Sequence, residues 1–170
     1  NNTPTVCGQV FEQGVGVKAC LTALQPAWDS ERTAAAKFNA ADKVLKRGVG
    51  IAAGWYGCGN TSLPNPSTIK TGVRADGTVV LHQGAMDIGQ GANTVITQIF
   101  AKALGIDVQQ IKLIGADTDV TPDAGKTSAS RQTYVSGSAA RLSGLALRAA
   151  ILQRVNASDS AKLEFGNGAI

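Results

Sequence analysis

The sequence predicts an α/β fold (α+β in the wider sense) that combines a βαβ unit and a hairpin with long amphipathic helices. Ile69, Thr71 and Val73 alternate with other residues, the turn residues Ala75-Asp76-Gly77 follow, and residues 78–82 continue as a strand. This pattern is typical of a β-hairpin. An apolar stripe at helical spacing comes next, made by Ala92, Val95, Ile96, Ile99, Phe100 and Ala103, and then a short apolar run at residues 111–115. The order strand, loop, helix, strand favours two parallel strands joined by a crossover helix.

The segment before the hairpin is predicted to hold two helices and a strand. Apolar residues of the first helix recur three and four positions apart, and Pro26 ends it. Asp29 or Ser30 caps the second helix, which Gly48 ends, and residues 49–55 are expected to form a buried strand. Residues 60–68 contain two prolines and are expected to be a loop. The apolar positions of the two helices are Val17, Cys20, Leu21 and Leu24, then Ala34, Phe38, Ala41, Val44 and Leu45.

After the last strand, a polar segment at residues 116–132 precedes a long helix. This segment is rich in Asp, Thr, Ser and Gly. Segments of this length without structure of their own are usually functional or disordered. The final helix is expected to bury one face, formed by Leu142, Leu145, Ala146, Ala149 and Leu152.

Composition narrows the class of protein. The 170 residues are 44% hydrophobic and 16% charged, so the chain can bury a core. The net charge of +4 is scattered along the chain, which argues against a nucleic-acid footprint. Its three cysteines are odd in number and form no C-x-x-C pair, so a reducing, cytoplasmic location is expected. No stretch has the apolar length of a membrane span, and the start lacks the pattern of a signal peptide.

Two segments are candidates for holding an anionic ligand. Gly89, Gln90 and Gly91 lie between a strand and a helix, where unpaired N–H groups and a partial positive charge favour an anion. An ordinary glycine-rich turn explains the same tripeptide. The second segment, residues 125–132, also precedes a helix, and Ser128, Ser130 and their backbone N–H groups are suited to an oxyanion.

Arg131 in this second segment is able to pair with phosphate or to lie on the surface, and a serine-rich helix cap is the plain alternative. Both segments leave strand ends. In open α/β sheets ligands bind outside the carboxyl ends of strands, so the two segments are expected to face one crevice.

Other motifs carry less weight. Gly125-Lys126-Thr127 mimics the end of a P-loop, but Val120 stands where that motif needs glycine. His82, the only histidine, is more typical of a structural residue at a strand end. Asp117, Asp119 and Asp123 lack the glycine and closing glutamate of a calcium loop, so a solvated acidic loop is expected. No catalytic residue and no metal site built from protein ligands is predicted.

Several motifs together resemble the molybdenum-cofactor-binding large subunit of the xanthine oxidase and aldehyde oxidoreductase family, in its second half. Residues 86–91, with Thr94 and Gln98, resemble the family's M-G-Q-G segment, and Leu104-Gly105-Ile106 resembles the end of its helix. Residues 117–123, residues 127–132 and Ser136-Gly137 resemble the family's small-residue cofactor loop and the stretch before it. Residues 8–12 and 54–60 are similar to the bacterial aldehyde oxidoreductase branch. The resemblance covers nearly the whole chain in the family's order.

The resemblance implies a molybdenum–molybdopterin cofactor in its cytosine dinucleotide form, with 2Fe–2S clusters and FAD on other domains or subunits. By match, Gly89, Gln90 and Gly91 contact the pterin and its phosphate. Ser128, Ala129, Ser130, Arg131 and Gln132 line the other side, with Ala129 nearest the metal. Tyr56 matches an aromatic wall of the substrate pocket. The chain then divides into a helical lead-in (1–47), a cofactor-binding core (48–155) and a polar tail (156–170).

The general base implied by the family is a glutamate in a C-terminal glycine-rich motif, and none of Glu12, Glu31 and Glu164 lies in such a motif. The chain is therefore expected to be the cofactor-binding portion of an enzyme that hydroxylates aldehydes or N-heterocycles with water, and to be inactive alone. Its expected partners are the remainder of the molybdenum subunit and an iron–sulfur domain or subunit, with no nucleic acid. The alternatives are a stand-alone nucleotide- or phosphate-binding module and a structural assembly domain.

Overall fold

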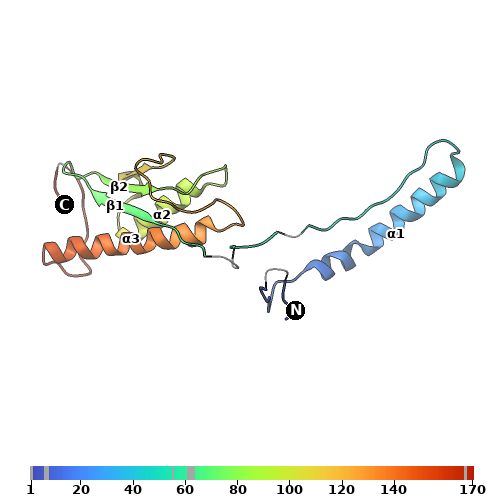
Figure 1. Cartoon of the computed structure of the whole chain (residues 1–170), viewed down its shortest axis with the longest axis horizontal. Coiled ribbons are helices and arrows are strands. Elements are labelled where there is room, and N and C mark those ends of the chain that lie inside the picture. The colour runs from blue at the N-terminus through green and yellow to red at the C-terminus, as the bar shows by residue number, and fades with distance from the viewer. Residues whose placement is uncertain (1, 6–7, 55, 61–63, 167) are drawn as a thin grey trace. The chain divides into compact units, whose positions relative to one another are not determined.

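The computed structural model describes residues 2–5, 8–54, 56–60, 64–166 and 168–170, which form two compact units (Figure 1). The first unit is Asn1–Tyr56 and the second is Gly57–Ile170. Within the described residues, no helix combines the length and apolar character needed to cross a membrane.

The first unit contains one long helix, α1 (Val17–Ala41), none of whose residues is buried. The prediction of two helices separated at Pro26 is wrong, because the helix continues through the proline. A proline inside a helix removes one N–H donor and costs about 3 kcal/mol, but α1 keeps its helical backbone on both sides of Pro26. Asp29, the expected cap, lies inside the helix, where its carboxylate accepts from Gln25 Nε2 at 3.0 Å.

The helix ends before Gly48, the residue that was expected to end it. Asp42 follows α1, and its carboxylate accepts the backbone N–H groups of Val44 and Leu45 at 2.8 Å each. The buried strand predicted for residues 49–55 is also wrong for residues 49–54. These residues form no strand and are mostly exposed, Ile51 by 50%, while Trp55 lies outside the described residues.

The second unit has a three-stranded mixed sheet in the order β1-β2-β3. β1 (Ile69–Val73) pairs antiparallel with β2 (Val79–Gln83), and β2 pairs parallel with β3 (Ile111–Ile114). Gly77, with φ of 83°, completes the turn between β1 and β2, donating its N–H to the Arg74 carbonyl at 2.9 Å. The predicted hairpin and βαβ unit are therefore confirmed.

Two helices cover one face of this sheet (Figure 1). α2 (Ala92–Leu104) connects β2 to the short 3₁₀ helix η1 (Val108–Gln110) and β3, and Gly105 ends it in the left-handed conformation as expected. α3 (Gln132–Arg154) follows the polar segment. The core between helices and sheet is made of Val79, Leu81, Ala85, Ala92, Ile96, Phe100, Leu104, Ala124, Ala140, Ile151, Leu152 and Leu163.

The face that α3 buries agrees with the prediction only at Leu152, which is buried, while the predicted Ala146 and Ala149 are exposed. Leu142 is 62% exposed and Leu145 is exposed, whereas Ser136, Gly137, Ala140 and Gly144 are buried. Small residues face α2 because the two helices approach closely. A Cβ added at Gly144 would lie 2.8 Å from Ala103 Cβ and 2.9 Å from the Phe100 carbonyl oxygen.

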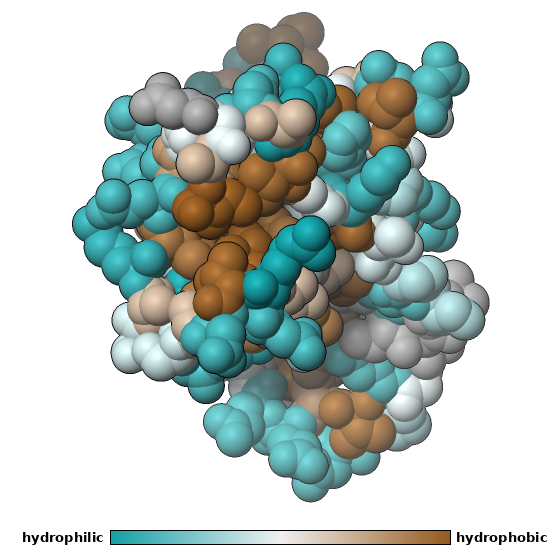
Figure 2. Space-filling view, turned by 90° about the vertical axis from the view of Figure 1, so that its left-hand side faces the viewer, coloured by the Kyte–Doolittle hydropathy of each residue, from teal (hydrophilic) through white to brown (hydrophobic). Residues whose placement is uncertain are grey.

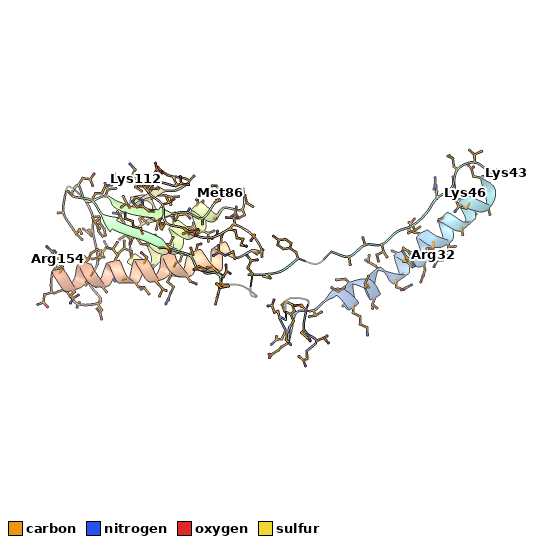
Figure 3. All side chains as sticks on the ribbon, viewed as in Figure 1. Arg32, Lys43, Lys46, Met86, Lys112 and Arg154 are labelled. Atoms are coloured by element: carbon orange, nitrogen blue, oxygen red, sulfur yellow. The ribbon has the colours of Figure 1, made fainter. Side chains whose placement is uncertain are left out.

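α2 and α3 run in the same direction, so both begin at the same end of the second unit. Gly137 and Gly144 of α3 lie against Ile99 and Ala103 of α2, respectively. At the other end, Arg148 donates to the carbonyl of Leu104, the last residue of α2, at 3.1 Å. In Figure 3, Met86 is labelled at the end of the second unit where α2 and α3 begin, and Arg154 is labelled at the opposite end. Figure 2 looks onto that opposite end, where apolar side chains gather among hydrophilic ones.

Candidate functional site

The candidate site is built by two segments that precede the parallel helices. The first loop is residues 84–91, between β2 and α2, and the second loop is residues 124–131, before α3. They are in contact: the Met86 carbonyl accepts from Thr127 Oγ1 at 2.8 Å. Gly84 has no room for a side chain because the Pro122 carbonyl oxygen lies against it. The structure therefore brings the two segments into contact, whereas the shared crevice that the sequence predicts for them stays a prediction.

Asp87 caps the N-terminus of α2 from within the first loop. Its carboxylate accepts the backbone N–H groups of Gly89 at 2.9 Å, Asn93 at 3.0 Å and Gly91 at 3.3 Å. The donation from Asn93, followed by that from Gly89, lowers the pKa of Asp87 below its usual value. An N–H donor stabilises the ionised carboxylate, so this side chain carries its charge at neutral pH.

Gln90 forms the exposed tip of the first loop. Its side-chain oxygen accepts from the Ile88 N–H at 2.7 Å, and its Nε2 donates to the Met86 carbonyl at 3.2 Å. Gly89 and Gly91 flank it with φ of 102° and 82°, and a Cβ on either would meet nothing within 4 Å. These glycines are therefore needed for their backbone conformation, and they leave open space beside the Gln90 amide.

A buried arginine fixes the second loop. Arg131 is only 1% exposed, and its Nη1 donates to the carbonyls of Ala124 at 2.7 Å and Lys126 at 2.8 Å. Its Nη2 donates to the Pro66 carbonyl at 2.8 Å, and its Nε donates to Asn65 Oδ1. A guanidinium satisfied by carbonyls on two chain segments holds those segments together. A surface position for Arg131, one of the alternatives from the sequence, is therefore wrong.

Ala129 and Ser130 both adopt the left-handed backbone conformation, with φ of 49° and 55°. This conformation costs a non-glycine residue about 1–2 kcal/mol and persists only where neighbouring contacts hold it. The Ala129 carbonyl accepts the Gly59 N–H at 2.5 Å, and Ser128 Oγ accepts from Asn60 Nδ2 at 3.0 Å. Ala129 is buried, whereas Ser130 is exposed. Ser130 is therefore exposed to solvent on a loop whose neighbouring residues, Ser128 and Ala129, are bound to Asn60 and Gly59.

Gln132, the first residue of α3, joins the two loops indirectly. Its Nε2 donates to Thr127 Oγ1 at 3.2 Å and to the Lys126 carbonyl at 3.3 Å, and its Oε1 accepts from Ser136 Oγ. A continuous chain of hydrogen bonds thus runs from Ser136 through Gln132 and Thr127 to the Met86 carbonyl, which also binds Gln90. Hydrogen bonds in such a network polarise and strengthen one another.

The predicted site residues differ in their exposure to solvent. Gln90 and Ser130 are exposed at the two loops, while the side chains of Arg131 and Gln132 are bound inside the protein. Tyr56 belongs to the first unit and is 74% exposed, and its role as a pocket wall stays a prediction. Sequence reasoning assigned no role to Asp87 or Thr127. The signal for Asp87 was available, because an Asp shortly before a helical stripe is a common cap.

The other candidates are structural. His82 Nδ1 lies 3.2 Å from the Val120 carbonyl oxygen. The carboxylates of Asp117 and Asp123 accept backbone N–H groups two residues further on, at 3.0 and 2.7 Å, as in ordinary turns. Across the described part of the chain, no three His, Cys, Asp or Glu side chains form a group that could hold a metal ion.

The geometry agrees with comparisons to known proteins. The profile of the molybdopterin cofactor-binding domain matches residues 22–170, most of the chain. The protein is therefore a molybdopterin cofactor-binding domain, or part of one. The xanthine dehydrogenase molybdenum-binding subunit of Escherichia coli O157:H7 is 40% identical over 114 residues, which are 64% of this chain and 15% of that protein.

A second relative, the aldehyde oxidoreductase of Megalodesulfovibrio gigas, is 36% identical over 100 residues, 57% of this chain and 11% of that protein. The crystal structure of the aldehyde oxidoreductase from Desulfovibrio desulfuricans ATCC 27774 superimposes with a TM-score of 0.59 at 27% identity, covering 95% of this chain and 17% of that one. The chain belongs to the xanthine dehydrogenase and aldehyde oxidoreductase family and covers part of its large subunit. The resemblance stated from the sequence is confirmed.

Proposed function

We propose that this chain supplies one part of the cradle for a molybdenum–molybdopterin cofactor, in its cytosine dinucleotide form, within a larger molybdenum hydroxylase. The observation that supports this function best is the contact between the two loops through the Met86 carbonyl, which brings Gln90 and the second loop to one end of the unit. The chain spans 11–17% of the length of the relatives named above, so the rest of the cradle lies in other segments.

The residues present fit a flat, polar group. Open space lies beside Gly89 and Gly91, where a Cβ would meet nothing, and the Gln90 amide both donates and accepts. Ser130 adds an exposed hydroxyl from the second loop. Glycine and small polar residues let a ligand approach the backbone, which a larger side chain would prevent.

In the second loop, some residues offer groups to the ligand and others hold the loop in place. Ser128 and Ser130 offer hydroxyls and backbone groups, and Ala129 lies between them as the residue nearest the metal. Arg131 and Gln132 serve the site through the loop that they hold, because their side-chain donors are already bound to carbonyls and to Thr127.

When bound, the cofactor supplies the redox chemistry for hydroxylation of an aldehyde or an N-heterocycle, with water as the oxygen source. This chain's residues bind and orient it. The general base, the Tyr56 pocket partners, the iron–sulfur clusters and FAD belong to other segments or subunits. The glutamates Glu12, Glu31 and Glu164 all lie outside the two loops.

The test uses the complete subunit that contains this chain. Gln90→Ala is compared with the matched control Gln109→Ala, since Gln109 is exposed in η1, beyond the far end of α2. Molybdenum is measured by metal analysis, and the nucleotide is identified after acid release. We expect Gln90→Ala to lower both molybdenum and cytidine monophosphate per polypeptide, and the control to leave both unchanged.

Unchanged cofactor content in Gln90→Ala would favour a purely structural domain. Tight binding of a plain nucleotide by this chain alone, with no molybdenum in the complete subunit, would favour an independent nucleotide-binding module instead.

A further inference from the structure

The N-terminus of α2 is already filled by an anion from the chain itself. Three backbone N–H groups, those of Gly89, Gly91 and Asn93, converge on the carboxylate of Asp87. The two glycines with positive φ alternate around Gln90, which turns neighbouring N–H groups toward one side. This is the place at which a helix would otherwise bind a phosphate.

We propose that Asp87 is a positioning residue for the cofactor: it occupies the N-terminal end of α2, fixes the first loop, and leaves the Gln90 amide as the group presented to the ligand. The inference rests on the proposed function. It also revises the expectation that the phosphate of the cofactor binds at residues 89–91. A carboxylate and a phosphate at one helix end repel each other, so the first loop meets a neutral part of the ligand.

The hydrogen bonds of Gln90 support this assignment. Its side-chain oxygen binds the Ile88 N–H, and its Nε2 binds the Met86 carbonyl, so both ends of the amide are oriented by backbone on either side of Asp87. Without the Asp87 carboxylate, the N–H groups of Gly89 and Gly91 would lose their acceptor, and the loop that orients Gln90 would lose its internal support.

No cation holds Asp87 in place. In the described ranges, the only ion pair joins Lys162 and Glu164, which lie in the C-terminal tail. The Asp87 carboxylate accepts from three backbone N–H groups, and these donors also keep its pKa low. Asp87 therefore acts as an ionised acceptor for the loop backbone, which a small carboxylate from solution is able to replace.

The test compares Asp87→Ala, Asp87→Asn and Asp87→Glu with Asp107→Ala in the complete subunit. Asp107 is a matched control, since its carboxylate caps η1 by accepting the Gln109 N–H at 2.8 Å. It lies beyond the opposite end of α2, which at 1.5 Å per residue is about 20 Å long. The readouts are the rate of cofactor release and the binding of inorganic phosphate by apo-protein.

We expect cofactor release from Asp87→Ala to be about 10- to 100-fold faster than from the wild type, the usual effect of losing a residue that orients a ligand-binding group. Added formate should slow this release again, because it restores a carboxylate to the vacated helix end. Asp87→Asn should not be rescued by formate, since its amide fills the space. Asp87→Glu should be intermediate, and Asp107→Ala should resemble the wild type.

Apo Asp87→Ala should bind inorganic phosphate at millimolar concentrations at which the wild type binds none. Equal phosphate binding by wild type and variant would overturn the proposal, as would loss of cofactor that formate does not reverse. If Asp87→Ala does not fold, the same comparison is made with Asp87→Asn by hydrogen exchange at Gly89 and Gly91. Unchanged exchange at both amides would then also overturn it.

The outcome is separable from that of the proposed function. Loss of cofactor in Gln90→Ala with normal retention in Asp87→Ala would remove only the role of Asp87. Normal retention in both variants would remove the proposed function itself, while the phosphate measurement would still report whether Asp87 fills the helix end.

Discussion

The two loops of the site lie side by side but are held in opposite ways. The first loop takes its shape from a solvent-accessible carboxylate, Asp87, and from glycines that face open space. The second loop takes its shape from the guanidinium of Arg131, which is buried and donates to the loop's own carbonyls. The first loop is therefore ordered by hydrogen bonds within itself, and the second loop is ordered by a buried side chain that also binds the distant Pro66 carbonyl.

This difference suggests separate roles for the two loops: the first contacts the ligand, and the second provides a fixed surface beside it. A locally held loop adjusts to a ligand without disturbing the core, whereas a loop fixed by a buried arginine provides an unchanging surface. Changes in the second loop should therefore affect the free energy of unfolding, and changes in the first loop should affect ligand binding.

The largest effect is expected from Arg131→Met. Removing a buried guanidinium leaves the carbonyls of Ala124, Lys126 and Pro66 without their donor, and we expect a loss of about 3–5 kcal/mol in the free energy of unfolding. Urea denaturation followed by circular dichroism measures it. Arg141→Met, at an exposed position of α3, should change stability by less than about 0.5 kcal/mol. Equal losses in both variants would contradict the supporting role of Arg131.

Replacing one glycine in each loop tests whether the second loop tolerates change less than the first. Gly125→Ala introduces a Cβ 3.0 Å from the Arg131 guanidinium nitrogens at a φ of 67°, so steric conflict adds to backbone strain. Gly91→Ala meets only the strain, because its surroundings are open. We expect about 2–3 kcal/mol for Gly125→Ala and about 1 kcal/mol for Gly91→Ala, again by urea denaturation. The reverse order would show that the second loop is the more tolerant one.

Acidification should loosen the first loop at Asp87. The folded-state pKa of Asp87 is depressed, so its stabilising contribution is complete above the usual value of 3.8 and is lost as pH falls through the lower folded value. Amide resonances of Gly89 and Gly91 should therefore shift with a midpoint below pH 3.8, and Asp87→Asn should abolish that shift. The Gly59 amide, which donates to the Ala129 carbonyl, is the internal control and should show no such transition.

The smallest effect is expected at the contact between the loops. Thr127→Val removes the hydroxyl that donates to the Met86 carbonyl, and we expect a loss of about 1 kcal/mol. Combined with Gln90→Ala, which removes the second donor to the same carbonyl, the losses should be non-additive by about 0.5 kcal/mol. Thr133→Val, at an exposed position in α3, is the control. Strict additivity would indicate that the shared carbonyl does not couple the loops.

Much of the second unit could be predicted because its signals are local. Alternation, the Ala75-Asp76-Gly77 turn and the apolar stripe of α2 together defined the hairpin and the βαβ unit. The two loops were found from glycine, serine and their place before helices. The hydrogen bonds that join them were not, because the Thr127–Met86 contact spans 41 residues and no local pattern encodes it.

The failures have physical causes. Two helices with apolar faces were expected in the first segment, yet α1 is one helix that buries none of its residues, since periodicity marks a face and not its partner. On α3, Leu152 is buried as expected, but Leu142 and Leu145 are exposed, and small residues such as Ala140 and Gly144 are buried instead. Close helix packing selects the smallest residues, and a hydrophobicity pattern does not register them.

The seam of small residues between α2 and α3 has a consequence for ligand affinity at a distance. Gly144 lies twelve residues into α3, about 18 Å along the helix from its start, and has no space for a methyl group against Ala103. Any side chain there would push the parallel helices apart and carry their leading ends with them. A substitution at Gly144 should therefore change the separation of the two loops, and with it the affinity of the proposed site for its cofactor, without contacting the ligand.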